Sequence, residues 1–171
     1  MSLLKKFMSL ALCAVLTASL FLSSGVFMVS AKKSDFVVEG TVLVEYIGED
    51  SEVVIPSDMG ITEIGDYAFA WSWDITSVTV PDSVIKIGEL TFVMCEGLEE
   101  IKIGAGNPAY SSVSGVLFNK AKTLLVRYPA GKPQVSYTIP NGVTAIGSYA
   151  FGGCAVLTNI VIPTGVQTIG V

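Results

Sequence analysis

Few residues in this 171-residue chain could do chemistry, because it contains no histidine and only three cysteines. Without histidine there is no serine–histidine–aspartate or cysteine–histidine nucleophile, no histidine general base and no histidine-ligated zinc site. Acidic residues number 15 against 10 basic ones. This balance argues against a nucleic-acid partner, whose phosphates need clustered lysine and arginine. We therefore predict no catalytic residues, no cofactor and no metal site.

Two groups of carboxylates are candidates for acid–base or calcium chemistry. Glu99 and Glu100 are adjacent, and Glu49, Asp50 and Glu52 form a second group. Such groups can serve as proton donors and acceptors or as calcium ligands. No calcium-binding loop motif accompanies them, so we interpret both groups as exposed strand and turn residues.

Cys95 and Cys154 could form a disulfide if the protein is exported. Each lies three residues after a phenylalanine in a repeated unit, so the two occupy the same position two repeats apart. The strand spacing then separates them by roughly 10 Å, which exceeds the reach of a disulfide. We predict two buried thiols that fill small core positions.

Trp71 and Trp73 are candidate aromatic anchors for a partner, because they lie in a loop and tryptophan often dominates binding. The alternative is that both rings pack against a loop at residues 59–60 or against an N-terminal hairpin. The sequence leaves both interpretations open.

The first 31 residues differ in composition from the rest. Lys5 and Lys6 precede an uncharged, mostly apolar run over residues 7–29, and Ala31 suits a cleavage site. This pattern is typical of a secretory signal peptide, although such a run could also remain as a membrane anchor. We expect cleavage near Ala31 and a secreted or cell-surface protein whose only membrane contact is through an uncleaved signal segment.

A repeat of about 23 residues organises the remaining chain, and repeats of this length predict a solenoid. Each copy has a proline followed six residues later by Ile-Gly and then a short aromatic unit. A six-residue stretch with apolar residues at its first, fourth and sixth positions follows, and we call this stretch the apolar comb. The proline segments are residues 80–88, 139–147 and 162–170, with 56–64 as a longer copy; the aromatic units are 65–69, 88–92 and 147–151; the combs are 75–80, 98–103 and 157–162.

Each comb alternates apolar and polar residues, which predicts a short strand with one buried face. The proline ends the strand, and the glycine of Ile-Gly relaxes the backbone before a helical turn. Aromatic residues should fill the layer behind the strands: Tyr67, Phe69, Phe92, Tyr149 and Phe151. We expect five adjacent parallel strands, around residues 53–55, 78–80, 101–103, 137–139 and 160–162.

Two segments depart from the repeat. Residues 41–47 and 53–55 predict a hairpin that caps the first repeat. Residues 115–119 and 123–128 predict a second hairpin, inside an insertion at about 105–134. The domains we expect are a signal peptide (1–31), a capping region (32–52) and a solenoid (53–171). Its last repeat is incomplete at Val171, so we expect a truncated reading frame or a fragment of a longer protein.

The order of Ile-Pro, Ile-Gly, Tyr-Ala-Phe, Cys and the apolar comb resembles the BspA-type leucine-rich repeats of bacterial surface proteins, also called the Treponema pallidum type. The resemblance covers roughly residues 53–171, with departures at Gly104, Ser72, Trp71 and Trp73. It implies an α/β fold: a right-handed leucine-rich-repeat solenoid with short parallel strands on its concave face, short helical turns behind and inserted β-hairpins.

The open strand face is the default ligand surface of a solenoid. Its outward residues are small and polar, which suits a broad contact better than a deep pocket. They are Glu52, Val54, Ser77, Thr79, Glu100, Lys102, Ser136, Thr138, Asn159 and Val161.

The resemblance implies a non-catalytic module for protein–protein interaction or adhesion, with a host matrix protein or another cell surface as partner. We also predict that the protein is a monomer. One alternative is an accessory carbohydrate- or cell-wall-binding domain of a larger exported enzyme. Another is a structural spacer. The sequence leaves the identity of the ligand and the mode of surface anchoring open.

Overall fold

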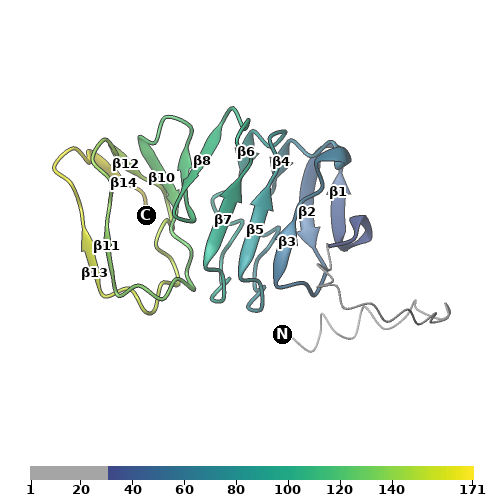
Figure 1. Cartoon of the computed structure of the whole chain (residues 1–171), viewed down its shortest axis with the longest axis horizontal. Coiled ribbons are helices and arrows are strands. Elements are labelled where there is room, and N and C mark those ends of the chain that lie inside the picture. The colour runs from purple at the N-terminus through teal and green to yellow at the C-terminus, as the bar shows by residue number, and fades with distance from the viewer. Residues whose placement is uncertain (1–30) are drawn as a thin grey trace, which may run out of the picture.

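The computed structural model describes residues 31–171, which form a β-solenoid of about six turns (Figure 1). Short strands dominate, and the only helices within these residues are two 3-10 turns, η2 (Lys33–Asp35) and η3 (Ser57–Met59). The strands are β1 (Phe36–Glu39), β2 (Val42–Tyr46), β3 (Glu52–Val54), β4 (Glu63–Ile64), β5 (Ser77–Val80), β6 (Lys86–Ile87), β7 (Glu100–Ile103), β8 (Tyr110–Val113), β9 (Val116–Asn119), β10 (Leu124–Arg127), β11 (Ser136–Thr138), β12 (Ala145–Ile146), β13 (Asn159–Val161) and β14 (Thr168–Ile169).

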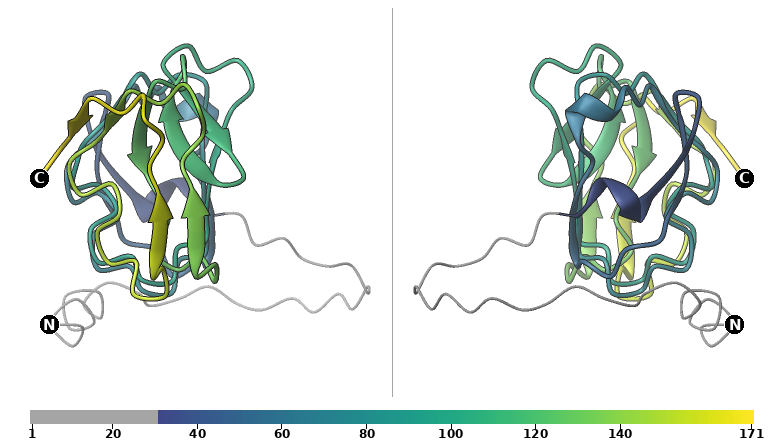
Figure 2. Two further views of the ribbon diagram at one scale, coloured as in Figure 1. Left: turned by 90° about the vertical axis from the view of Figure 1, so that its left-hand side faces the viewer. Right: turned by 90° about the vertical axis from the view of Figure 1, so that its right-hand side faces the viewer.

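Each regular repeat contributes two strands, and these lie in two separate rows. The apolar combs form β3, β5 and β7, which pair in parallel in that order. The Ile-Gly segments form the second row. In its N-terminal part, β4 pairs in parallel with β2 and β6 pairs in parallel with β4; in its C-terminal part, β12 pairs in parallel with β10 and β14 pairs in parallel with β12. The end-on views show strands and turns wrapping around a common interior (Figure 2).

The comb strands do not form the continuous five-stranded row that the sequence predicts. The row is divided into a three-stranded sheet, β3-β5-β7, and a two-stranded sheet, β11-β13. The physical reason lies in the segment between β7 and β11. There the Ile101 amide donates to the Gly115 carbonyl at 3.0 Å, and the Ser112 hydroxyl donates to the Ile101 carbonyl. These bonds occupy the edge of β7 where the next comb strand would pair.

Only the central strand of the segment that divides the row, β9, is buried inside the solenoid. β9 pairs antiparallel with β8 and with β10, and its residues 116–118 are all buried. Leu117 belongs to the N-terminal hydrophobic core, whereas Val116 and Phe118 belong to the C-terminal one. Because side chains alternate across a strand, β9 supplies both cores and forms the boundary between them.

The predicted helical turns behind the strands are wrong. Residues 65–74 and 88–98 form hydrogen-bonded turns instead, and successive repeats are joined by a ladder of backbone bonds. The Tyr67, Phe69 and Trp71 amides donate to the carbonyls of residues 90, 91 and 93 in the next repeat. In a helix the same amides would donate along the helix axis to carbonyls of their own segment, so bonding to the next repeat excludes a helix here. We call this third side of the solenoid the turn layer.

Glycine follows isoleucine in each repeat because successive turns approach each other closely at this point. A Cβ atom on Gly88 would lie 2.5 Å from the Asp66 Oδ1 atom and 2.7 Å from the Asp66 backbone nitrogen. The backbone of Gly88 is not in the left-handed region. The sequence interpretation of a relaxed backbone is therefore wrong here, and the absence of a side chain is what the fold requires.

The N-terminal hairpin also differs from its prediction. β2 pairs antiparallel with β1 and parallel with β4, whereas β3 pairs with β5 in the other row. Residues 41–47 and 53–55 therefore belong to different sheets. The predicted signal peptide lies outside the described residues, apart from Ala31.

A ladder of aromatic rings fills the interior behind the turn layer. Tyr46, Phe69 and Phe92 follow one another with ring centroids 5.6 Å apart at each step. Tyr128 and Phe151 continue the ladder in the C-terminal core at 5.5 Å. Stacked rings of this kind add about 0.5–1.5 kcal/mol per pair beyond their buried area. The repeat of one aromatic residue per turn therefore stabilises each turn against its neighbour. The predicted aromatic layer is wrong for Tyr67 and Tyr149, which are 50% and 52% exposed.

Candidate functional site

The strand face carries the predicted outward residues in two register rows. Glu52, Ser77 and Glu100 lie side by side across β3, β5 and β7, and Val54, Thr79 and Lys102 form the next row. On the second sheet, Ser136 pairs with Asn159 and Thr138 with Val161. The predicted register within each sheet is therefore confirmed.

Most of these side chains are accessible, but one is not. Ser77 is only 7% exposed, because its short side chain lies between the longer side chains of Glu52 and Glu100. Thr79 and Glu100 are half-buried, whereas the others are exposed: Glu52, Val54, Lys102, Ser136, Thr138, Asn159 and Val161. Ser77 is thus the one predicted contact residue that the fold withdraws from the surface.

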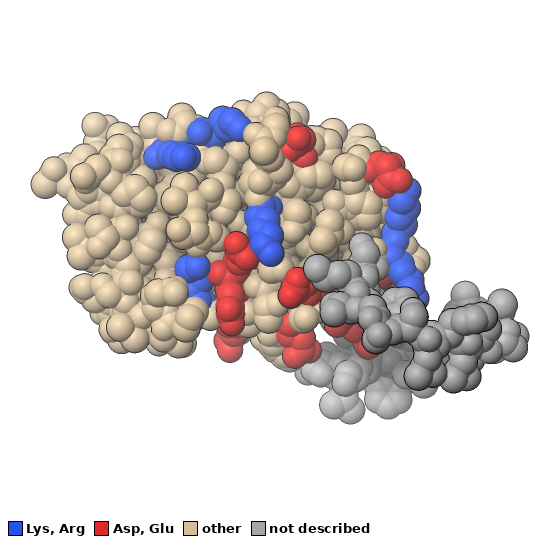
Figure 3. Space-filling view, in the orientation of Figure 1, with Lys and Arg blue, Asp and Glu red and all other residues tan. Residues whose placement is uncertain are grey.

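Charge on the strand face is mainly negative. Acidic side chains gather over the lower parts of strands β3 to β7 (Figure 3). The Lys102 ammonium lies 3.3 Å from a Glu100 carboxylate oxygen, and both side chains are about half exposed. An exposed pair of this kind contributes about 0–1 kcal/mol to stability, so both charged groups can exchange this contact for one with a partner.

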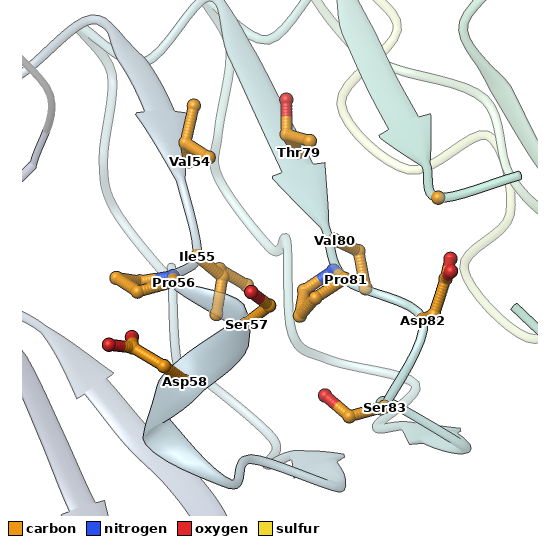
Figure 4. A pocket seen from close by; sticks show the side chains of 11 residues that line it. Val54, Ile55, Pro56, Ser57, Asp58, Thr79, Val80, Pro81, Asp82 and Ser83 are labelled. Carbon is orange, nitrogen blue, oxygen red and sulfur yellow. The ribbon is translucent and has the colours of Figure 1, made fainter. Parts of the chain in front are cut away.

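A shallow hollow of about 680 Å³ lies where β3 and β5 end. Val54 and Thr79 border it from adjacent strands, Pro56 and Pro81 form its middle, and the Asp58 and Asp82 carboxylates lie near the turns (Figure 4). Lys33 pairs with Asp58 and lowers the pKa of that carboxyl, first through the hydrogen bond between them. The hollow extends the strand face toward the proline turns.

The structure places Trp71 and Trp73 on the outer surface of the turn layer. Trp71 is 40% exposed and Trp73 is 45% exposed. The Trp71 ring stacks on the Tyr67 ring, with centroids 5.9 Å apart and planes 8° from parallel. These two residues lie on a different side of the solenoid from the strand face, so the predicted site residues form two surfaces.

Both cysteines of the described residues are thiols that donate to the preceding repeat. Cys95 is buried, and its Sγ donates to the Phe69 carbonyl at 2.9 Å. Cys154 is partly buried, and its Sγ lies 3.7 Å from the Tyr128 carbonyl. Burial raises the pKa of the Cys154 thiol, which disfavours the reactive thiolate. The prediction of two thiols is confirmed, although only Cys95 is fully buried.

Sequence reasoning missed Arg127, which is 5% exposed. Its guanidinium donates to the Phe92 carbonyl at 2.9 Å, the Gly152 carbonyl at 3.0 Å and the Tyr149 carbonyl at 2.5 Å. Burial lowers the pKa of this guanidinium, and the nearby thiols of Cys154 and Cys95 oppose that change. The sequence could have predicted this burial, because Arg127 lies two residues after the inward Leu125 in a strand, and side chains two residues apart point to the same face.

Two negative findings hold for residues 31–171. No three histidine, cysteine, aspartate or glutamate side chains there converge as a metal site would require. No helix in the same residues is long and apolar enough to cross a membrane.

The sequence profile of the BspA type leucine rich repeat region matches this chain in six copies, over residues 51–127 and 130–171. The matched residues make up more than half of the chain. No curated protein matches the chain significantly.

Solved structures of bacterial leucine-rich repeat proteins are similar to this one. The pneumococcal vaccine antigen PcpA is 27% identical, with a TM-score of 0.60 over 71% of this chain and 36% of its own. A leucine-rich repeat protein from Eubacterium ventriosum is 26% identical, with a TM-score of 0.56 over 70% and 43%. A leucine rich cell surface protein from Faecalibacterium prausnitzii is 26% identical, with a TM-score of 0.50 over 70% and 35%. The chain thus spans less than half the length of each of these proteins.

Proposed function

This chain belongs to the BspA type leucine rich repeat family, and from that membership we propose that it is an exported, non-catalytic module that binds a protein partner through its strand face. The partner we propose is a protein of a host matrix or of another cell surface. The observation that carries the proposal is the parallel register that places Glu52, Glu100, Thr79 and Lys102 on one face of β3, β5 and β7, each at least partly exposed. Polar ladders on a solenoid sheet support broad protein contacts.

The neighbouring structures support this proposal. One of them is described as a cell surface protein and another as a vaccine antigen. The absence of histidine supports a non-catalytic role, because the common nucleophile and general-base systems depend on that residue. The shallow hollow beside the strand face suits a protein loop better than a small molecule, which needs a more enclosed site.

Adhesion of coated particles tests the strand face. Beads coated with the purified protein should adhere to layers of cultured host cells and to their deposited matrix. The double variant Thr79→Lys, Lys102→Glu changes side chains in one exposed register row and should lower adhesion at least threefold. The circular dichroism spectrum should not change, because both side chains point away from the core.

Lys120→Glu is the control, because it repeats the lysine-to-glutamate replacement of the variant at an exposed residue after β9, outside the comb sheets. It should leave adhesion within twofold of the parent protein. Equal adhesion by the parent and the strand-face variant would refute the proposed interface. No adhesion by the parent to either surface would refute the proposed partner class.

Export has its own test. The lysines at positions 5 and 6, the uncharged run and Ala31 support cleavage of residues 1–31. Amino-terminal sequencing of protein recovered from the medium or the cell surface of an expressing bacterium should begin at Lys32. Recovery of the uncleaved chain in the membrane fraction would instead support retention of the segment as an anchor.

A further inference from the structure

The outer surface of the turn layer carries a group of large side chains that the core does not use. We call Tyr67, Trp71, Trp73 and Met94 the aromatic patch. Their exposed fractions are 50%, 40%, 45% and 44%. The interior of these turns is already filled by the stacked rings of the aromatic ladder. The patch therefore exposes apolar area that contributes little to folding.

Comparison between repeats shows that the fold does not require these side chains. Trp71 corresponds to Met94 in the next repeat and to Gly153 in the repeat of residues 147–162, where Ala155 corresponds to Trp73. Trp71 has a φ of 59° and Gly153 a φ of 79°. This left-handed backbone favours glycine. A bulky aromatic side chain at this position is therefore conformationally unfavourable, and packing does not explain its presence.

Two rings of the patch lie against each other, and the backbone connects them to the next repeat. Tyr67 and Trp71 are stacked, and the Trp71 amide donates to the Val93 carbonyl at 3.1 Å. This bond holds Trp71 beside the repeat that carries Met94, about 4.8 Å away by the spacing of adjacent strands. The patch therefore spans two repeats on one side of the solenoid.

Carboxylates accompany the patch, and cations are absent from the same turns. Asp66 and Asp74 flank the two tryptophans in the chain, Glu89 and Glu96 occupy the next turn, and all four are exposed. Residues 65–76 and 88–99 contain no lysine or arginine. The Asp66 carboxylate also accepts a hydrogen bond from the Leu90 amide at 3.0 Å, which places it between the two turns.

We propose that the aromatic patch binds an arginine-rich segment of a protein partner, at a surface separate from the strand face. A guanidinium group is planar and weakly hydrated, so it stacks on tryptophan and tyrosine rings. The same group forms two-pronged hydrogen bonds with carboxylates. A lysine ammonium can satisfy the charge but has no planar face to stack. The combination of exposed rings and flanking carboxylates therefore selects arginine.

Intrinsic fluorescence gives a direct test, because Trp71 and Trp73 are the only tryptophans of the chain. The probe is a hexa-arginine peptide, with hexalysine and hexaglutamate for comparison. Hexa-arginine should change the tryptophan emission in a saturable manner and bind at least threefold more tightly than hexalysine. Hexaglutamate should leave the emission unchanged. Equal binding of the arginine and lysine peptides would overturn the stacking argument.

Variants locate the site, with affinity measured by anisotropy of a labelled hexa-arginine peptide. Trp71→Gly with Trp73→Ala introduces the residues found at the corresponding positions 153 and 155, so it should fold and should weaken binding at least tenfold. Tyr149→Ala is the matched control. Tyr149 is an exposed tyrosine with positive φ in the same layer, but residues 147–158 contain no carboxylate. This control should bind within twofold of the parent.

Other outcomes would overturn the proposal. If Glu52→Gln with Glu100→Gln removes binding while the tryptophan variant binds normally, the peptide occupies the strand face. If soluble glycan fragments of cell walls quench the tryptophans and hexa-arginine does not, the patch binds carbohydrate instead. Should the tryptophan variant fail to fold, the emission change of the parent protein still decides whether the peptide reaches the patch.

Discussion

Replacement of Arg127 by methionine should weaken the joint between the two hydrophobic cores. Methionine keeps an unbranched apolar stem and removes the guanidinium group. Three carbonyls would then lose a charged donor, although the Tyr149 and Phe92 carbonyls keep the backbone amides of Gly152 (2.9 Å) and Cys95 (3.4 Å) as donors. The Phe92 carbonyl lies in the N-terminal part of the solenoid, and the Tyr149 and Gly152 carbonyls lie in the C-terminal part. The side chain therefore connects segments that β9 otherwise divides.

The size of the effect follows from these contacts. Among the described residues, the Gly152 carbonyl is the one of the three left without a donor, which costs about 1–3 kcal/mol, and the other two carbonyls each lose one charge-assisted bond. The gain from no longer burying a charge offsets part of this cost, and within the described residues the Arg127 Nε already has no hydrogen-bond partner. We expect a net loss of about 2–4 kcal/mol in the free energy of unfolding. The free energy of unfolding of Arg127→Lys should lie between those of the parent protein and Arg127→Met, because an ammonium lacks the fixed planar arrangement of donors that reaches all three acceptors.

Urea unfolding followed by circular dichroism measures the change. A solenoid unfolds cooperatively only while neighbouring repeats remain coupled. Arg127→Met should therefore broaden or divide the transition as well as lower its midpoint. Lys120→Met is the control, since it replaces an exposed cation and should change stability by less than about 0.5 kcal/mol. A loss below about 0.5 kcal/mol for Arg127→Met, with an unchanged slope, would refute the reasoning.

Three further predictions follow from burial and close contact. Burial raises the pKa of Tyr46 and Tyr137 to about 12 from 10.0; their contribution to stability is therefore complete below pH 10.0 and decreases as the pH rises toward about 12. Melting temperatures at successive alkaline pH values should show this decrease, and Tyr137→Phe should reduce it. Cys95→Ser should cost less than about 1 kcal/mol in a urea titration, because a hydroxyl can still donate to the Phe69 carbonyl; a larger loss than for Cys95→Ala would contradict this role. Gly88→Ala should lose about 1–3 kcal/mol, because its Cβ would overlap the backbone of Asp66; unchanged stability would show that this contact relaxes easily.

Sequence patterns were sufficient to predict the repeat, the family and the register of the comb strands within each sheet. The alternation around Val78 and Ile101 places apolar side chains in the interior, and both are fully buried. The same alternation could have revealed the second row of strands, since Ile64, Ile87 and Ile146 are also inward residues of short strands. We interpreted those segments only as turns, because a proline precedes them and a glycine follows.

Local residue types determine which side chains are buried within one repeat, because a strand alternates its faces and one repeat resembles the next. The tertiary structure alone decides how the repeats meet. The bond from Arg127 to the Phe92 carbonyl joins residues 35 positions apart, and β9 divides a row of strands that the sequence shows as continuous. The exposure of Trp71 also depends on which rings already fill the interior. Such contacts involve residues far apart in the chain, so no local pattern specifies them.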